Sequence, residues 1–363
     1  MNTTPHRPLR AGLISGFVLR AARTSIPTTQ QGLAELLAVD LAIVQGWESG
    51  RRPLANMKAG ILLGMRRRLA VLGASPAVLA LLDPAMDADR IIAAVLTADD
   101  DAEHPLGEWV HTRRTAHMLA WALTGTPPHS VADLLAAPRR GPAGVAPLLD
   151  PDDRRIFFDR LRNTAESAPR TDAGGILLHR QALYLSSYDR SPQAVAWTAD
   201  ALHARREALT ARGWTPRWAE ARSTAAALAR LGDPVPMYDF IERAMADDDG
   251  EAANLNYWAY WLGVAHQPQA DDTFMRDRTL TGLDPVALLR ALADGMHFAP
   301  GYVDLYTHSL WALLHAHPWL PQALPALSAS LAGRLDRLLD EGGISPRSKR
   351  ELGAVHYVLH QNR

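Results

Sequence analysis

Residues 28–53 hold the pattern that most constrains the fold, because two short helical segments there surround a tight turn. In the first segment Leu33, Leu36 and Leu37 recur at helical spacing, which predicts one buried face. Ala34 is small enough to let a second helix cross closely. The stretch therefore predicts a compact pair of crossing helices.

The second segment carries its own start and stop signals. Residues 38–40 form the turn, and Asp40 is a good N-cap for the helix that follows. Val44 and Trp47 are three residues apart, so both should point inward as anchors. Gly50 then suits a left-handed helix end.

Polar residues at the ends of both helices are placed to meet phosphate. Thr28 or Thr29 can cap the first helix, because a hydroxyl oxygen accepts from the free amides of a first turn. Gln30 falls in that turn, where backbone amides and a side chain can meet one phosphate together. Arg51 and Arg52 follow the second helix directly and can bind phosphate as well.

These signals form a recognisable set. They are Thr29, Gln30, Leu33, Ala34, Glu35, Val39, Asp40, Val44, Trp47, Glu48, Gly50, Arg51, Arg52 and Pro53. In them, roughly residues 10–72 resemble the lambda-repressor-like (XRE) family of bacterial helix-turn-helix regulators. The resemblance implies that the second helix lies in the major groove of DNA and that the first crosses the backbone. The expected DNA-binding residues are Gln30, Asp40, Leu41, Ala42, Gln45, Arg51 and Arg52.

The groove-facing positions depart from the family, which usually places polar side chains there. Leu41, Ala42 and Gly46 lie on the outer side of the second helix and cannot hydrogen-bond a base edge, although apolar side chains can contact a thymine methyl. Gln45 is the single long polar reader. Either DNA shape and phosphate contacts carry much of the specificity, or the domain has become a protein-interaction module.

Charge is distributed unevenly along the chain. Residues 1–72 contain ten basic and three acidic residues, whereas the whole chain has 38 basic and 39 acidic residues. The remainder therefore has 28 basic and 36 acidic residues. A basic head on an acidic body is the pattern expected when phosphate binding is confined to one end.

Composition excludes several classes of protein. The 363 residues contain no cysteine, which rules out disulfides, thiolate catalysis and cysteine-bound zinc. No stretch approaches about 20 uninterrupted apolar residues, so no membrane span is expected. The first residues lack the apolar core of a signal peptide, and the sequence predicts a cytoplasmic protein.

Helix-breaking residues and charged runs divide the chain into four regions. Residues 1–9 read as a flexible arm and residues 10–75 as the helix-turn-helix domain. Residues 76–104 read as a linker with a short helix and an acidic run. Residues 105–363 read as an all-helical domain for dimerisation or sensing.

Nearly every segment of that last region has helical periodicity, so the fold class is predicted to be all-α. The expected helices span residues 106–124, 151–167, 173–188, 191–212, 215–231, 235–247, 250–266, 284–296, 301–316, 320–341 and 345–361. Short loops between such helices favour either a helical repeat, with fragments like those of tetratricopeptide repeats, or a helical bundle.

Two side-chain clusters in the body are candidate sites. Tyr257, Trp258, Tyr260 and Trp261 would surround one helix, where they either pack a helix crossing or line a groove for a ligand or partner. His356 and His360 are four apart, a spacing that can chelate a metal, but no Glu follows His356 as in metalloproteases. The chain shows no phosphate loop and no nucleophile elbow, and we expect no metal, no cofactor and no catalytic residues.

These features predict a sequence-specific bacterial transcriptional regulator and not an enzyme. Its expected partners are double-stranded DNA, a second copy of the chain in a homodimer and an effector that is a small molecule, a peptide or a protein. No membrane partner is expected. The alternative is a protein-interaction scaffold with a degenerate helix-turn-helix.

Overall fold

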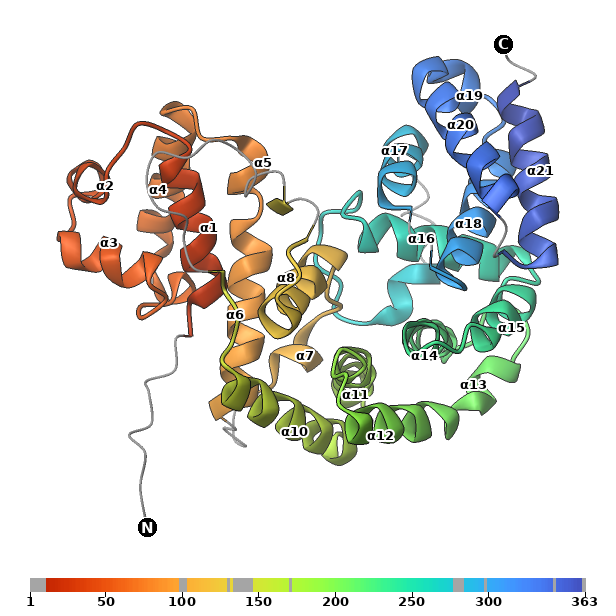
Figure 1. The fold of residues 1–363 in the computed structure, drawn as a ribbon, viewed down its shortest axis with the longest axis horizontal. Helices are drawn as coiled ribbons and strands as arrows, with labels where there is room; N and C mark the ends of the chain where they lie inside the picture. Colours follow the sequence, from red (N-terminus) through yellow and green to blue (C-terminus); the bar gives the residue numbers. More distant parts are fainter. Residues whose placement is uncertain are drawn as a thin grey trace. The chain divides into compact units, whose positions relative to one another are not determined.

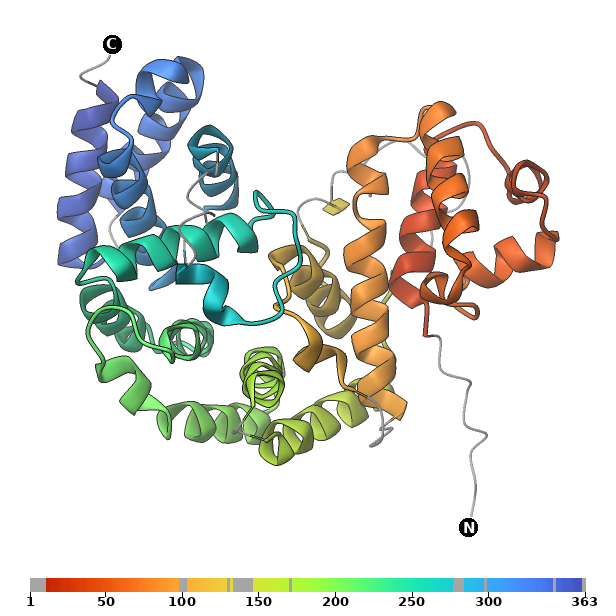
Figure 2. The ribbon, with the colours of Figure 1, turned by 180° about the vertical axis from the view of Figure 1, so that it is seen from behind.

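The fold is that of a computed structural model. It describes residues 11–97, 103–128, 131–132, 146–169, 172–276, 284–296, 299–341 and 344–360. Every regular element among these residues is a helix, which confirms the all-α prediction (Figures 1 and 2). The chain divides into two compact units, residues 1–167 and residues 168–363, called the N-terminal and C-terminal units below. No helix of the described segments is long and apolar enough to cross a membrane.

The N-terminal unit is organised around its first helix, α1, which contacts α3, α5 and α6. Its elements are α1 (Leu13–Thr24), α2 (Gln30–Leu37), α3 (Leu41–Glu48), the 3-10 turn η1 (Leu54–Asn56), α4 (Ala59–Val71), α5 (Pro76–Leu79), α6 (Leu82–Thr97), α7 (Pro105–Glu108), α8 (Arg113–Thr124) and α10 (Pro151–Ser167). The side chains of Ile14, Phe17 and Val18 bury the inner face of α1. The segment predicted as one helix, residues 106–124, forms two helices, α7 and α8.

The segment predicted as a linker is instead part of the core of this unit. Helix α6 packs along α1 (Figure 1). The carboxylate of Asp89 accepts hydrogen bonds from the backbone N–H groups of Ile14 (2.9 Å) and Ser15 (2.8 Å) in the first turn of α1. Because Ile91 and Ile92 are also buried, α6 cannot be separated from α1 without exposing apolar surface.

The compact unit continues past both predicted domain boundaries, at residues 75 and 105. Helices α8 and α10 both pack against α6, so the compact unit extends to residue 167. The short helix expected in this segment is the 16-residue α6, which has Pro84 in its first turn, where proline is tolerated. The arm at residues 1–9 and the acidic run at residues 99–101 lie outside the described residues.

The C-terminal unit is a succession of helices joined by short connections. Its elements are α11 (Ala173–Ser186), α12 (Pro192–His203), α13 (Arg206–Thr210), α14 (Trp218–Arg230), α15 (Val235–Ala244), α16 (Asp248–Trp261), the 3-10 turn η2 (Asp272–Arg276), α17 (Pro285–Gly295), α18 (Tyr302–Ala316), α19 (Leu320–Ala323), α20 (Pro325–Glu341) and α21 (Pro346–His360). The predicted helices 191–212 and 320–341 are each divided in two. At residue 325 a proline without an N–H starts a new helix.

Contacts in this unit pass from each helix mainly to those near it in sequence. Helix α11 contacts α12 and α14, α14 contacts α15, and both α15 and α16 contact α18 (Figure 2). Helix α18 in turn contacts α21, which packs on α20. Helix α18 thus links α15 and α16 to the C-terminal pair α20–α21.

Candidate functional site

Helices α2 and α3 occupy the residues predicted for the two short helices. The hydroxyl of Thr29 caps α2 by accepting a hydrogen bond from the N–H of Gly32 (3.0 Å). Ala38 closes the helix in a left-handed conformation, with φ of 53°. Val44 and Trp47 are buried as predicted, but Leu36 is 38% exposed, so its predicted place in the buried face of α2 is wrong.

A buried ion pair that sequence reasoning missed fixes α3 to α1. Arg23 of α1 donates from Nη2 to Oε2 of Glu48 (2.9 Å), and both residues are buried. Gln30 donates from Nε2 to the same carboxylate oxygen (2.6 Å). Arg23 also donates to the carbonyl oxygen of Thr28 (3.0 Å), so the network holds the start of α2 against the end of α3.

The predicted groove-facing side chains lie together on the outer side of α3. Asp40, Leu41, Ala42 and Gln45 are all exposed. Asp40 occupies the N-cap position, but its carboxylate makes no capping hydrogen bond. Four neighbouring positions therefore present a carboxylate, two apolar groups and one amide to solvent.

Arg51 and Arg52, which follow α3, are exposed. Gly46 was predicted to lie on the outer side of α3, and this prediction is wrong. Gly46 is buried because Arg52 lies across it, and a Cβ built on Gly46 would be 2.9 Å from Cδ of Arg52. The backbone N–H of Arg52 donates to the carbonyl oxygen of Gly46 (3.0 Å). Arg51 donates from Nε to the hydroxyl of Ser49 (3.1 Å). These two hydrogen bonds fix where the side chains of Arg51 and Arg52 begin, directly after the last turn of α3.

More positive charge follows on α4, although not all of it is available to a ligand. Lys58, Arg67 and Arg68 are exposed. Arg66 instead forms a double hydrogen bond with Asp83 of α6 (2.8 and 2.9 Å).

The aromatic run of α16 packs inside the C-terminal unit. Tyr257, Trp258 and Tyr260 are at most 4% exposed, and Trp261 is half-buried. The guanidinium carbon of Arg222, from α14, lies 3.8 Å from the ring centre of Tyr257 and 4.8 Å from that of Trp258. Two of the rings therefore already bind a cation of the protein itself, which favours core packing over an open ligand groove.

A cavity of about 690 Å³ lies elsewhere in the C-terminal unit, among α15, α16, α17, α18 and α21. Its charged lining is mainly acidic, with Glu242, Asp248 and Glu251 among the carboxylates and Arg347 as the arginine. Trp311 adds an aromatic wall. None of its lining residues belongs to the predicted DNA-binding set or to the aromatic cluster of residues 257–261.

A buried histidine fixes one carboxylate of that cavity. Nε2 of His308 lies 3.0 Å from Oε1 of Glu251, and its Nδ1 lies 3.0 Å from Oε1 of Glu351. Burial lowers the pKa of His308, but the hydrogen bonds and charges of the two glutamates raise it by more, so the net shift is upward. The fold thus holds an imidazole between two carboxylates that favour its charged form.

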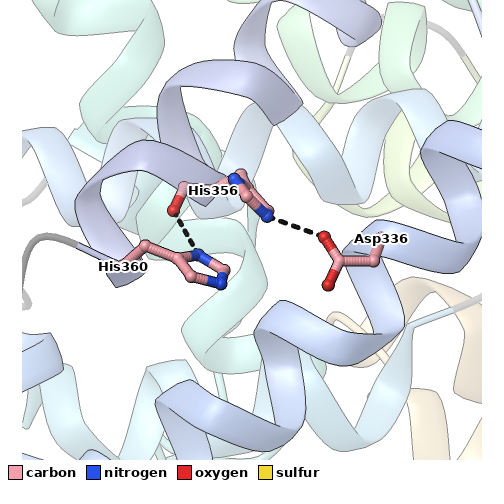
Figure 3. A group of neighbouring side chains, drawn as sticks. All are labelled: Asp336, His356 and His360. Carbon is pink, nitrogen blue, oxygen red and sulfur yellow. Dashed lines mark hydrogen bonds and ion pairs between the residues drawn. The ribbon is translucent and has the colours of Figure 1, made fainter. Parts of the chain in front are cut away.

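Asp336, His356 and His360 form a separate cluster on the helix pair α20–α21 (Figure 3). Nε2 of His356 lies 2.7 Å from Oδ1 of Asp336. Nδ1 of His360 donates to the carbonyl oxygen of His356 (2.9 Å), and the two imidazole rings stack with centres 3.9 Å apart. The structure therefore adds a carboxylate to the pair of histidines that sequence spacing had singled out.

Comparison with known proteins identifies no relative. No family model matches the chain, and neither a curated protein nor a solved structure matches it significantly.

Proposed function

We propose that α2 and α3 form a helix-turn-helix of the XRE type and that the protein is a DNA-binding transcriptional regulator. The observation that carries the proposal is the outer side of α3. There Leu41, Ala42 and Gln45 are exposed, and Arg51 and Arg52 follow at once. An α-helix with its side chains is about 10–12 Å in diameter, and a major groove about 12 Å wide admits it.

Buried anchors support a reading role for this side of α3. Val44 and Trp47 hold the inner side of the helix, and Glu48 is tied to Arg23. A surface so fixed keeps one geometry when it meets the DNA, as a preorganised binding surface requires. With Gln45 as the one long polar reader, phosphate contacts and DNA deformability supply much of the specificity in this proposal.

The test removes the basic pair. The change of Arg51 and Arg52 to alanine should weaken binding of the full-length protein to any duplex DNA by about 10- to 100-fold. It should also lower the slope of log affinity against log salt by about 2, since two phosphate contacts are lost. Fluorescence anisotropy with a random-sequence duplex at several salt concentrations measures both quantities.

Arg155→Ala is the matched control for this experiment. Its side chain is 66% exposed in α10, far in sequence from α3, and its loss should leave both affinity and slope unchanged. Equal DNA binding by the double variant and the wild type at physiological salt would refute the assignment of this surface.

One observation favours a second candidate function, a protein-interaction scaffold. Leu36 and Leu41 are exposed near the turn between α2 and α3, where a partner protein could cover them. DNA binding separates the two functions, because the scaffold would show no salt-dependent affinity for duplex DNA.

The C-terminal unit has two roles in this proposal. It dimerises the protein, so that two copies of α3 meet major grooves about one helical turn, or a multiple, apart. Its acidic cavity also receives the effector, and the carboxylates and Trp311 suit a ligand with basic groups. Analytical ultracentrifugation and DNA footprinting test the dimer, and a full-length monomer on a single half-site would exclude it.

A further inference from the structure

We propose that Asp336, His356 and His360 form a binding site for a divalent transition-metal ion, and that zinc is the ion that fits it best. The proposal depends only on the C-terminal unit and not on DNA binding. One ligand atom from each residue lies within 4.8 Å of the other two (Figure 3). Two imidazoles and one carboxylate are a donor set that zinc prefers, and three protein ligands leave a fourth position open.

The backbone positions of the three ligands are fixed by the interface of α20 with α21. Asp336 follows the fully buried Leu335, and His356 follows Val355, which is 2% exposed. The ligands therefore stand at the edge of a packed apolar seam, with their side chains half-exposed or exposed and accessible to ions. A site on two packed helices is better fixed than one on a loop.

Hydrogen bonding prepares His360 for metal. A carbonyl oxygen can only accept, so Nδ1 of His360 carries the proton that is donated to His356. In the neutral ring the lone pair is then on Nε2, which is the atom left to bind a metal. Metal-binding histidines almost always donate their other ring N–H to a carboxylate, a backbone carbonyl or water, and His360 makes a contact of this kind.

The contact between His356 and Asp336 needs only a small adjustment to admit an ion. Ligand atoms about 2.0–2.2 Å from a tetrahedral zinc lie about 3.4 Å apart. Nε2 of His356 and Oδ1 of Asp336 are now 2.7 Å apart, closer than that value. An ion would replace this direct contact by moving two side chains apart by less than an ångström, and it would then link α20 to α21.

The experiment titrates tag-free, full-length protein with Zn²⁺ against a chelating dye and with Co²⁺ by visible absorption. We expect one Zn²⁺ per chain at this site and cobalt bands of a four-coordinate complex. His356→Ala or His360→Ala should weaken zinc binding by more than the about 10- to 100-fold that loss of an outer-shell contact costs. Asp336→Asn, at an exposed position, tests the carboxylate with little risk to folding.

His203→Ala is a matched control. His203 also bonds the backbone carbonyl four residues earlier and lies 3.9 Å from a carboxylate oxygen, that of Asp233. No second histidine joins that pair in a metal-ligating cluster of the described residues, so the change should leave zinc binding intact. Zinc should also raise the melting temperature of the wild type but not that of His360→Ala.

Two outcomes would overturn the proposal. One is a wild-type protein that takes no zinc from the dye. The other is a bound ion that persists unchanged in both His360→Ala and Asp336→Asn, since that ion would lie at another site.

Discussion

Two pairs of arginines, one pair in each unit, lie in opposite surroundings. In the N-terminal unit Arg51 and Arg52 stand in solvent after α3. In the C-terminal unit Arg180 and Arg222 are buried, the first against Asp272 and the second under aromatic rings. Exposed cations can bind a large polyanion. Buried cations instead pair with groups inside the fold, so the carboxylates dominate the charge of the cavity in the C-terminal unit.

The comparison depends on the N-terminal unit being one folding body, and truncation tests that most strongly. A fragment of residues 1–75 should remain unfolded, because it lacks α6, which buries α1 and accepts its first N–H groups. A fragment of residues 1–167 should fold cooperatively. Circular dichroism and urea unfolding measure this, and a cooperative transition in the shorter fragment would contradict it.

The N-terminal unit also contains a buried ion pair, Arg23–Glu48, which is an exception to this comparison. Removing one partner should have the next largest effect on the free energy of unfolding. Glu48→Ala should lower the unfolding free energy by about 3–5 kcal/mol, because it leaves a buried guanidinium without its carboxylate. Glu35→Ala, at an exposed position of α2, should change it by less than about 0.5 kcal/mol. Replacing the pair together, as Arg23→Met with Glu48→Leu, should recover most of the loss in urea unfolding.

Asp89 offers a pH test of a buried charge in the same unit. Burial raises the pKa of Asp89 to about 7, against backbone hydrogen bonds from Ile14 and Ser15 that lower it. Between pH about 4 and 7 the folded unit therefore keeps a proton that the unfolded chain releases. The unfolding free energy should fall by about 4 kcal/mol as pH rises through that window and level off above it.

Asp89→Asn should remove this fall, measured as the difference from wild type in urea unfolding of residues 1–167. The difference is the quantity to compare, because burial also raises the pKa of Asp87 to about 6. Asp152→Asn, at an exposed position of α10, should leave the pH profile as it is. A profile unchanged by Asp89→Asn would mean that this carboxyl is ionised in the folded unit at pH 5.

The smallest effect sharpens the role of the exposed face. Gln45→Ala should leave stability within about 0.5 kcal/mol, since its side chain is exposed. It should reduce discrimination between preferred and mismatched DNA by about 1 kcal/mol. Competition binding on sites selected from a random pool measures this, and an unchanged preference would remove Gln45 as a reader.

Local signals could be predicted from the sequence, and long-range ones could not. The cap at Thr29, the anchors Val44 and Trp47 and the left-handed Gly50 follow from spacing within a few residues. The role of Glu48 depends on Arg23, which lies 25 residues earlier, and no local pattern links them.

The body shows the same limit. Among the helices expected between residues 105 and 363, α10 spans residues 151–167 as predicted, and α18 begins one residue after its predicted start. The acidic cavity and the addition of Asp336 to the two histidines depend on packing between helices. The exposure of Leu36 likewise reflects which neighbours α2 has and not its own periodicity.

If α3 binds DNA as proposed, the cover that Arg52 forms over Gly46 limits how the protein could acquire new DNA targets. Any larger residue at position 46 would displace Arg52 and so disturb its proposed phosphate contact, without changing a proposed base-reading side chain. Variation that changes sequence preference alone is then confined to Leu41, Ala42 and Gln45, with Asp40 beside them. A library randomised at residues 41, 42 and 45 is small enough to screen exhaustively. It would test the direct-readout variants that leave Arg52 and the buried anchors of α3 unchanged.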